Sequence, residues 1–173
     1  MAKQSAGVLP YRLSKDMLEV FLVHPGGPFY KNKDLGAWSI SKGEFETETP
    51  FKAALREFEE ETGFSVNGKF IELTPIKQKS GKMVYGFAVE ATIDPEKIVS
   101  NTFTIEFPPK SGRMQEFPEV DRAAWFTLFD AKQKIISYQV PLIVELSEKL
   151  GIDEVNHESE VSHDATYCQP SLF

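Results

Sequence analysis

The hydrophobic pattern at the start of the chain predicts a pair of strands. Two apolar runs, residues 6–12 and 17–24, are separated by the turn-prone segment Leu13-Ser14-Lys15-Asp16. Apolar runs of this length, bounded by turn residues, are typical of paired strands. The segment Pro25-Gly26-Gly27-Pro28 ends the second run and residues 29–36 are loop-like, so we expect the short apolar run 37–40 to be a strand that leads into Ser41-Lys42-Gly43-Glu44.

The clearest helix is predicted to begin at Pro50 and to end at Gly63. Thr49 suits the N-cap, and proline suits the first helical position because the N–H it lacks would have no partner there. Glycine is a common helix terminator. An apolar stripe at i, i+3, i+4 and i+7 predicts packing against a sheet. The stripe consists of Phe51, Ala54, Leu55 and Phe58.

The rest of the chain continues as alternating strands and helices without internal repeats. Strands are predicted at residues 69–77, 83–91 and 123–126, and helices at residues 129–136 and 140–150. A chain of 173 residues with 41% hydrophobic content suffices for one buried core. We therefore expect a single α+β domain over residues 1–150, followed by a polar C-terminal tail at residues 151–173.

Charge and cysteine content exclude several classes of protein. The net charge of −7 and the absence of a basic stripe disfavour duplex nucleic acid as a partner. Residues 1–7 are too short and polar for a signal peptide, and no apolar run approaches the roughly 20 residues that cross a bilayer. The single cysteine, Cys168, excludes an intramolecular disulfide framework. We expect a cytoplasmic protein, monomeric or homodimeric, without a membrane partner.

Three glutamates share the polar face of the predicted helix. Glu57, Glu60 and Glu61 fall at i, i+3 and i+4. Like charges at this spacing destabilise a helix by roughly 0.2–0.5 kcal/mol per pair. Carboxylate oxygens are preferred ligands of Mg²⁺, and a bound ion would remove the repulsion. The cluster therefore predicts a magnesium site, with Mn²⁺ as a second possibility, whereas taken alone it is more typical of a solvated helix face.

The residues around this cluster favour the metal site. Arg56 directly precedes the glutamates, Gly63 and Phe64 follow them, and Glu48 lies eight residues before Arg56. Together with the upstream glycine loop, this spacing resembles the Nudix box of the Nudix hydrolases, here Gly43–Phe64. The resemblance implies an α/β/α sandwich with a mixed sheet and a hydrolase acting on phosphorus-containing anhydrides.

Two departures from the family pattern lie before the helix. Four residues separate Gly43 from Glu48, where the pattern has five, so the loop is one residue short. Loop length is easily absorbed at this place, and the register from Glu48 to Phe64 is intact. Ser41 stands where many relatives have proline, and we assign no chemical consequence to that difference.

The resemblance also implies roles for individual residues. Glu57, Glu60 and Glu61 match the metal-binding, catalytic glutamates of the box, and Glu57 is positioned to orient or deprotonate the attacking water. Arg56 matches the arginine that pairs with box carboxylates, here Glu48 or Glu57. We expect both Arg56 and Glu48 to act as supporting residues.

Outside the helix, further candidates come from the loops. The backbone carbonyl of Lys42 or Gly43 is a candidate metal ligand, and both residues are predicted to bind substrate, Lys42 through phosphate. Relatives often carry another acidic residue before a tryptophan-containing strand, and Glu119 is our candidate, with Glu116 and Asp121 close behind. The remaining candidates are lysine or arginine residues for phosphate and aromatic residues for a nucleobase. They are Lys79, Lys82 and Arg113, and Phe29, Tyr30 and Trp38.

Three functions compete at this stage. The first is a magnesium-dependent pyrophosphohydrolase of nucleoside triphosphates or dinucleoside polyphosphates, with water attacking phosphorus. The second is the same chemistry on a nucleotide sugar, NADH or an inositol pyrophosphate. The third is a non-catalytic Nudix module that binds a nucleotide. The complete glutamate set disfavours the third, because a binding module has no need of a repulsive cluster.

Overall fold

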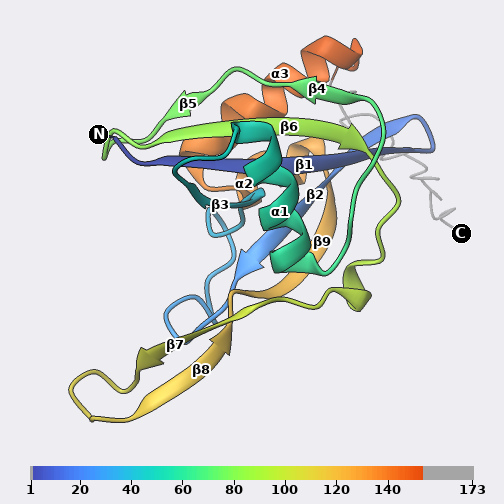
Figure 1. Ribbon diagram of the computed structural model, residues 1–173. Coiled ribbons are helices and arrows are strands. Elements are labelled where there is room, and N and C mark those ends of the chain that lie inside the picture. Colours follow the sequence, from blue (N-terminus) through green and yellow to red (C-terminus); the bar gives the residue numbers. More distant parts are fainter. Residues whose placement is uncertain (1, 154–173) are drawn as a thin grey trace, which may run out of the picture.

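A mixed β-sheet forms the centre of the molecule, and helices cover both of its faces (Figure 1). The computed structural model describes residues 2–153. Within these residues the sheet has seven strands, in the order β4-β6-β1-β2-β9, with β3 paired to β1 and β5 paired to β6. Their bounds are β1 Gln4–Ser14, β2 Met17–Pro25, β3 Ser41–Phe45, β4 Phe70–Glu72, β5 Ile76–Lys77, β6 Met83–Glu90 and β9 Val120–Thr127.

The long central strand β1 organises the sheet. One edge of β1 pairs in parallel with β6, and the other edge is divided between two antiparallel partners. Its first half, Gln4 to Val8, pairs with β3, and its second half, Tyr11 to Ser14, pairs with β2. Beyond β2, strand β9 pairs antiparallel with it. A single loop leaves β2 and enters β3, and it therefore connects the two partners on this edge of β1.

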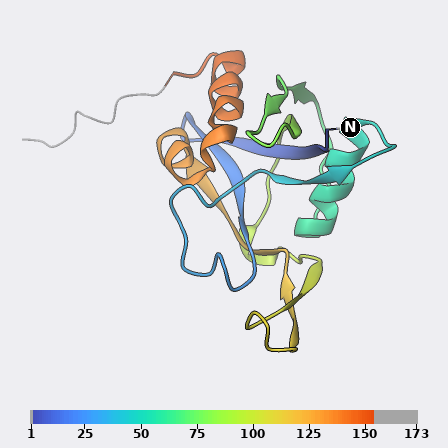
Figure 2. The same ribbon diagram turned by 90° about the vertical axis from the view of Figure 1, so that its left-hand side faces the viewer.

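Two separate hydrophobic cores lie on the two faces of the sheet (Figure 2). Successive strand residues point to opposite faces, so Val8 and Phe21 enter one core while Leu9 and Leu22 enter the other. Helix α1, Pro50–Thr62, covers the first core. Helices α2, Leu128–Lys134, and α3, Val140–Leu150, cover the second. This arrangement confirms the predicted α+β sandwich.

The predicted boundaries of α1 are confirmed. Thr49 Oγ1 accepts a hydrogen bond from the N–H of Lys52 at 3.3 Å, and Pro50 begins the helix. Gly63 adopts the left-handed conformation with φ of 77°, and its N–H donates to the carbonyl of Glu59. The apolar stripe packs on the sheet as predicted: Phe58 is fully buried, and Phe51 meets the rings of β4 and β6 edge-on. The apolar stripe of α1 therefore faces the core, and the polar face of the helix is turned away from it.

Several strand predictions are corrected by the structure. The predicted strand at residues 37–40 is wrong, because Trp38 and Ser39 make only isolated bridges to different partners, and the ladder to β1 starts at Ser41. The predicted strand 69–77 is divided into β4 and β5. Pro75 lacks an N–H, and the N–H of Thr74 donates to the side chain of Glu145 instead of a strand. The helix predicted at 129–136 runs from Leu128 to Lys134.

A two-stranded arm that was not predicted projects from the body (Figure 1). It consists of β7, Thr102–Glu106, and β8, Met114–Pro118, and these strands pair only with each other. Two short 3₁₀ helices, η1 Pro95–Lys97 and η2 Ser137–Gln139, lie in connections. The base of the arm is attached to α1, because the N–H of Asn101 donates to the carbonyl of Glu60 at 2.8 Å. The arm therefore begins and ends beside the glutamate face.

Two further expectations concern the ends of the chain and membranes. The predicted tail at residues 151–173 lies outside the described residues, apart from its first three positions. None of the helices in residues 2–153 is long and apolar enough to cross a membrane.

Candidate active site

Two adjoining pockets lie between α1, β3 and the loops that leave β2 and enter β9. The first, which we call the carboxylate pocket, is lined by Glu57, Glu60, Glu61 and Glu119 together with Lys42, Gly43 and Phe103. The second, which we call the side pocket, is lined by Tyr30, Tyr138, Ile40, Ile136 and Val120. Lys42, Glu61, Glu119 and Pro25 line both pockets. The two pockets therefore adjoin at these shared residues.

Gly43 and Glu57 lie close together in the carboxylate pocket. Glu57 is 9% exposed and lies in the part of α1 that faces β3. A Cβ atom at position 43 would lie 2.0 Å from the carboxyl carbon of Glu57, far inside van der Waals contact. Position 43 must therefore be glycine for the Glu57 carboxylate to occupy this place. Burial is the main cause that raises the pKa of Glu57, opposed by Arg56 and reinforced by Glu60 and Glu119.

Arg56 holds three of the box carboxylates. Its Nη1 donates to Glu57 Oε1 at 2.7 Å and lies 3.3 Å from both oxygens of Glu60. Its Nε donates to Glu48 Oε1 at 2.9 Å, and Nη2 bonds to the same oxygen. Both predicted partners, Glu48 and Glu57, are confirmed as contacts. The arginine thus ties the loop before α1 to the helix face, and it lowers the pKa of Glu48.

Glu61 has a partner that the sequence did not indicate. The buried hydroxyl of Ser41 donates to Glu61 Oε2 at 2.7 Å. Burial raises the pKa of Glu61 to about 7, with a further increase from Glu57 and Glu119 and a decrease from the Ser41 hydrogen bond. The expectation that Ser41 has no chemical consequence is therefore wrong. Proline, which has no hydroxyl, would leave this carboxylate without its donor.

Of the three acidic candidates near β9, Glu119 alone lines the carboxylate pocket. Its backbone is held on both sides, since its N–H donates to Asn101 and its carbonyl accepts from the N–H of Gly26. Burial, then the charge of Glu60, raises its pKa. Glu116 is exposed on the arm, and Asp121 bonds to His24 instead. The catalytic role of Glu119 stays a prediction.

The carboxylate pocket suits a hard cation in its donor chemistry, although its side chains are not yet arranged around one. Within residues 2–153, no three acidic, histidine or cysteine side chains are arranged, as they stand, so that together they could hold a metal ion. Glu57 and Glu60 face Arg56, and Glu61 faces Ser41. The carboxylates nevertheless raise one another's pKa across the pocket. A divalent cation would relieve this repulsion once the side chains turn to it, and all-oxygen donors suit Mg²⁺ or Mn²⁺.

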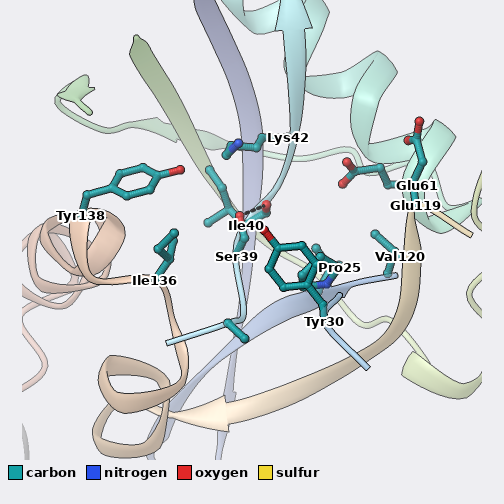
Figure 3. A pocket seen from close by; sticks show the side chains of 12 residues that line it. Pro25, Tyr30, Ser39, Ile40, Lys42, Glu61, Glu119, Val120, Ile136 and Tyr138 are labelled. Atoms are coloured by element: carbon teal, nitrogen blue, oxygen red, sulfur yellow. Dashed lines mark hydrogen bonds between the residues drawn. The ribbon is translucent and has the colours of Figure 1, made fainter. Parts of the chain in front are cut away.

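The side pocket is a cavity of about 230 Å³ whose lining includes two tyrosines (Figure 3). Tyr138 lies on one side, Glu61 and Glu119 lie on the other with Lys42 between the two sides, and Tyr30 stands in front of Ser39 and Pro25. The fully buried side chain of Gln139 holds the wall. Its Oε1 accepts from the N–H of Ile40 at 2.9 Å, and its Nε2 donates to the hydroxyl groups of Ser39 and Tyr138.

The other sequence candidates fall in different places. Tyr30 lines the side pocket, whereas Trp38 is buried in the core and Phe29 packs on Phe107 of the arm. Lys42 lines both pockets, whereas Lys82 is paired with Glu44 at 3.0 Å. Lys79 and Arg113 line neither pocket. Tyr138 and Gln139 were missed, because nothing in their local sequence marks them; Gln139 reaches a partner 99 positions away.

Comparison with known proteins gives the class. A family model for the NUDIX domain matches residues 1–146, and the chain therefore belongs to the Nudix family. The predicted family is confirmed, and with it the predicted enzyme class, a hydrolase of phosphorus-containing anhydrides. No curated protein matches the sequence significantly.

Solved structures share the fold. The NUDIX domain of Shewanella oneidensis NrtR, complexed with ADP ribose, is 16% identical with a TM-score of 0.59, covering 87% of this chain and 89% of that one. An Ap4A hydrolase of Caenorhabditis elegans is 21% identical with a TM-score of 0.57, covering 87% and 98%. A NUDIX hydrolase of Listeria monocytogenes is 19% identical with a TM-score of 0.57, covering 85% and 93%. At these identities the likeness is one of fold.

Proposed function

We propose that the protein is a magnesium-dependent pyrophosphohydrolase that cleaves the diphosphate linkage of a nucleoside triphosphate or a dinucleoside polyphosphate by attack of water at phosphorus. The observation that carries the proposal is that the two pockets adjoin and share Lys42, Glu61 and Glu119 in their linings. One pocket offers anionic oxygens for a metal ion, and the other offers aromatic and apolar walls. A nucleotide has the two matching parts, a phosphate chain and a planar base.

In this proposal the carboxylate pocket performs the chemistry. Glu57, Glu60 and Glu61 would hold the Mg²⁺ ion, which when bound supplies charge neutralisation at the phosphate oxygens and a more acidic water. Glu57 is the buried carboxylate whose pKa is raised, which suits a group that accepts a proton from water. Glu119, which also lines this pocket, is the alternative acceptor. Arg56 keeps Glu57 and Glu60 oriented.

Lys42 and the tyrosines would bind the substrate in this scheme. Because Lys42 lines both pockets, its ammonium group would contact a phosphate that lies where the two pockets adjoin. Tyr30 and Tyr138 offer ring faces and hydroxyl groups to a nucleobase. Two structural neighbours, one complexed with ADP ribose and the other an Ap4A hydrolase, support a nucleotide substrate in general.

A substrate panel tests the proposal. Purified protein is incubated with nucleoside triphosphates, Ap4A, ADP-ribose, NADH, a nucleotide sugar and an inositol pyrophosphate, each with Mg²⁺, with Mn²⁺ and with EDTA. We expect metal-dependent cleavage of a nucleoside triphosphate or Ap4A, and a loss of at least about a hundredfold in Glu60→Gln. Glu59→Gln is the matched control, because Glu59 is the exposed neighbour of Glu60 and lines neither pocket.

The same panel separates the alternatives. Cleavage confined to NADH, a nucleotide sugar or the inositol substrate would move the activity to that class. Nucleotide binding without cleavage in any metal would indicate a non-catalytic module. Equal activity of Glu60→Gln and the intact protein would refute the role given to the glutamate cluster.

A further inference from the structure

His24 is a fully buried titratable residue that the proposed chemistry does not use. It lies near the end of β2, and its ring stands edge-on against Trp38 with the ring centroids 5.1 Å apart. Each ring nitrogen has a polar partner. Nε2 lies 2.6 Å from the carbonyl oxygen of Lys33, and Nδ1 lies 2.8 Å from Asp121 Oδ1.

The partners of His24 define how many protons the ring and its acid hold. A carbonyl oxygen only accepts, so Nε2 must carry a proton and donate it to Lys33. An ionised Asp121 also only accepts, so Nδ1 must donate as well, which makes the ring an imidazolium. The other arrangement, a neutral ring with protonated Asp121, contains the same number of protons. In either form, the two hydrogen bonds of His24 require one proton more than a neutral imidazole and an ionised carboxylate carry together.

Other charged groups surround the pair. On β9, Arg122 Nη1 lies 3.8 Å from Asp121 Oδ2, and the Arg122 guanidinium also lies over the Trp38 ring. From the loop and α2, Asp34 accepts from Trp38 Nε1 at 2.8 Å and is paired with Lys134. Beyond the imidazole, Arg122 is thus the cation that contacts Asp121 in the described residues.

The two hydrogen bonds of His24 join the walls of the side pocket. Lys33 belongs to the loop between β2 and β3 and is directly coupled to Tyr30. Its N–H donates to the Tyr30 carbonyl at 2.9 Å, and its ammonium lies 5.2 Å from the centroid of the Tyr30 ring. Asp121 follows Glu119 and Val120, which line the pocket opposite. A single buried ring therefore links the loop that carries Tyr30 to the strand that follows Glu119.

We propose that His24 is a positioning residue that clamps the Tyr30 loop to the start of β9, and so sets the side pocket for the base of the substrate. The expected effect on KM rests on the proposed function, whereas the two hydrogen bonds of His24 do not depend on any activity. It acts only through Lys33 and Asp121, since His24 lines neither pocket.

Two variants separate a clamp from simple packing. In His24→Phe, a ring still packs on Trp38 while both hydrogen bonds are lost. In Asp121→Asn, a neutral His24 satisfies both partners, because Nε2 still donates to Lys33 and the asparagine amide donates to Nδ1.

The first measurement is independent of catalysis. In protein with ¹⁵N-labelled histidine, we expect Nε2 of His24, assigned by its absence in His24→Phe, to carry a proton in both the intact protein and Asp121→Asn, and the Nδ1 signal to differ between the two. Hydrogen exchange followed by mass spectrometry should be faster in the peptide covering residues 26–36 in His24→Phe, and unchanged there in Asp121→Asn. Unchanged exchange of this loop in His24→Phe, or a general acceleration over the whole sheet, would overturn the clamp.

The second measurement links the clamp to the substrate. With Ap4A and ADP-ribose as probes, KM should rise about tenfold in His24→Phe, with kcat within about threefold. In Asp121→Asn KM should stay near that of the intact protein, because both hydrogen bonds of His24 are kept. A fall of kcat without a change of KM would overturn the positioning role. If the intact protein cleaves neither probe nor any other panel substrate, the proposed function fails, while the exchange and ¹⁵N results still decide the clamp.

Discussion

The two pockets that meet at Lys42 and Glu61 differ in their walls and in how they are held. The carboxylate pocket is strongly anionic and is built mostly from β3 and α1, which are consecutive elements held together by Arg56. The side pocket is mainly apolar and brings together the loop after β2, the start of β9 and the segment before α3. It is held by two fully buried polar side chains, His24 and Gln139.

This difference indicates that the two pockets have different roles in the proposed reaction. The carboxylate pocket depends on charge repulsion that a metal ion would remove, so changes there should alter the rate of the chemical step and the response to metal. The side pocket depends on shape and on hydrogen bonds between distant segments, so changes there should alter substrate affinity. Three further predictions test whether the two pockets respond in these different ways.

The largest effect is expected from Gly43→Ala. The new Cβ would meet the Glu57 carboxylate at 2.0 Å, and this flexible side chain must turn away. We expect activity to fall by about a hundredfold or more, while the free energy of unfolding falls by no more than about 1–3 kcal/mol. Kinetic assays and urea unfolding measure the two quantities. In the control Gly86→Ala, the Cβ meets only flexible leucine side chains at 3.2 Å or more, and activity should be retained.

A smaller effect is expected in the pH dependence of stability. Glu61 has a pKa of about 7 in the fold against its ordinary 4.5, so the fold favours its protonated form. The contribution of protonated Glu61 to the free energy of unfolding is therefore complete below about pH 4.5 and is lost as the pH rises through 7. In EDTA, urea unfolding should show a decline of about 2 kcal/mol across this range, after allowance for partial exposure.

Glu61→Gln and metal provide the checks on that decline. The glutamine variant cannot ionise, and most of the decline should disappear, while Mg²⁺ should raise the stability of the intact protein at pH 8 more than at pH 5. An equally steep decline in Glu61→Gln would assign the effect to the other carboxylates of the pocket.

The smallest effect is expected from Tyr30→Ala, which removes one aromatic wall of the side pocket. Loss of a base-stacking ring should raise KM for Ap4A by about tenfold, with kcat nearly unchanged. Phe29→Ala is the matched control, because Phe29 is the adjacent aromatic residue but contacts Phe107 of the arm. If both variants raised KM equally, the base would lie along the arm rather than in the side pocket.

Elements with short-range signals were predictable from the sequence. Helix α1 was predicted with both ends, since Thr49, Pro50 and Gly63 act on their immediate neighbours. The face shared by Glu57, Glu60 and Glu61 follows from helical spacing alone. The arm is the main element that was missed, although the alternation of Thr102 to Glu106 is a strand pattern. Its strands pair only with each other, and this pairing is not visible in either strand alone.

The sequence by itself determined the glutamate face of α1, the strand pair that begins the sheet and the Nudix class, because each depends on residue types at fixed short spacings. Only the tertiary structure decided that Ser41 bonds to Glu61, that Glu119 rather than Asp121 lines the pocket, and that Gln139 supports Ile40. These contacts join residues from 20 to 99 positions apart. A hydrogen bond over such a separation depends on how the whole chain packs, and no local propensity records it.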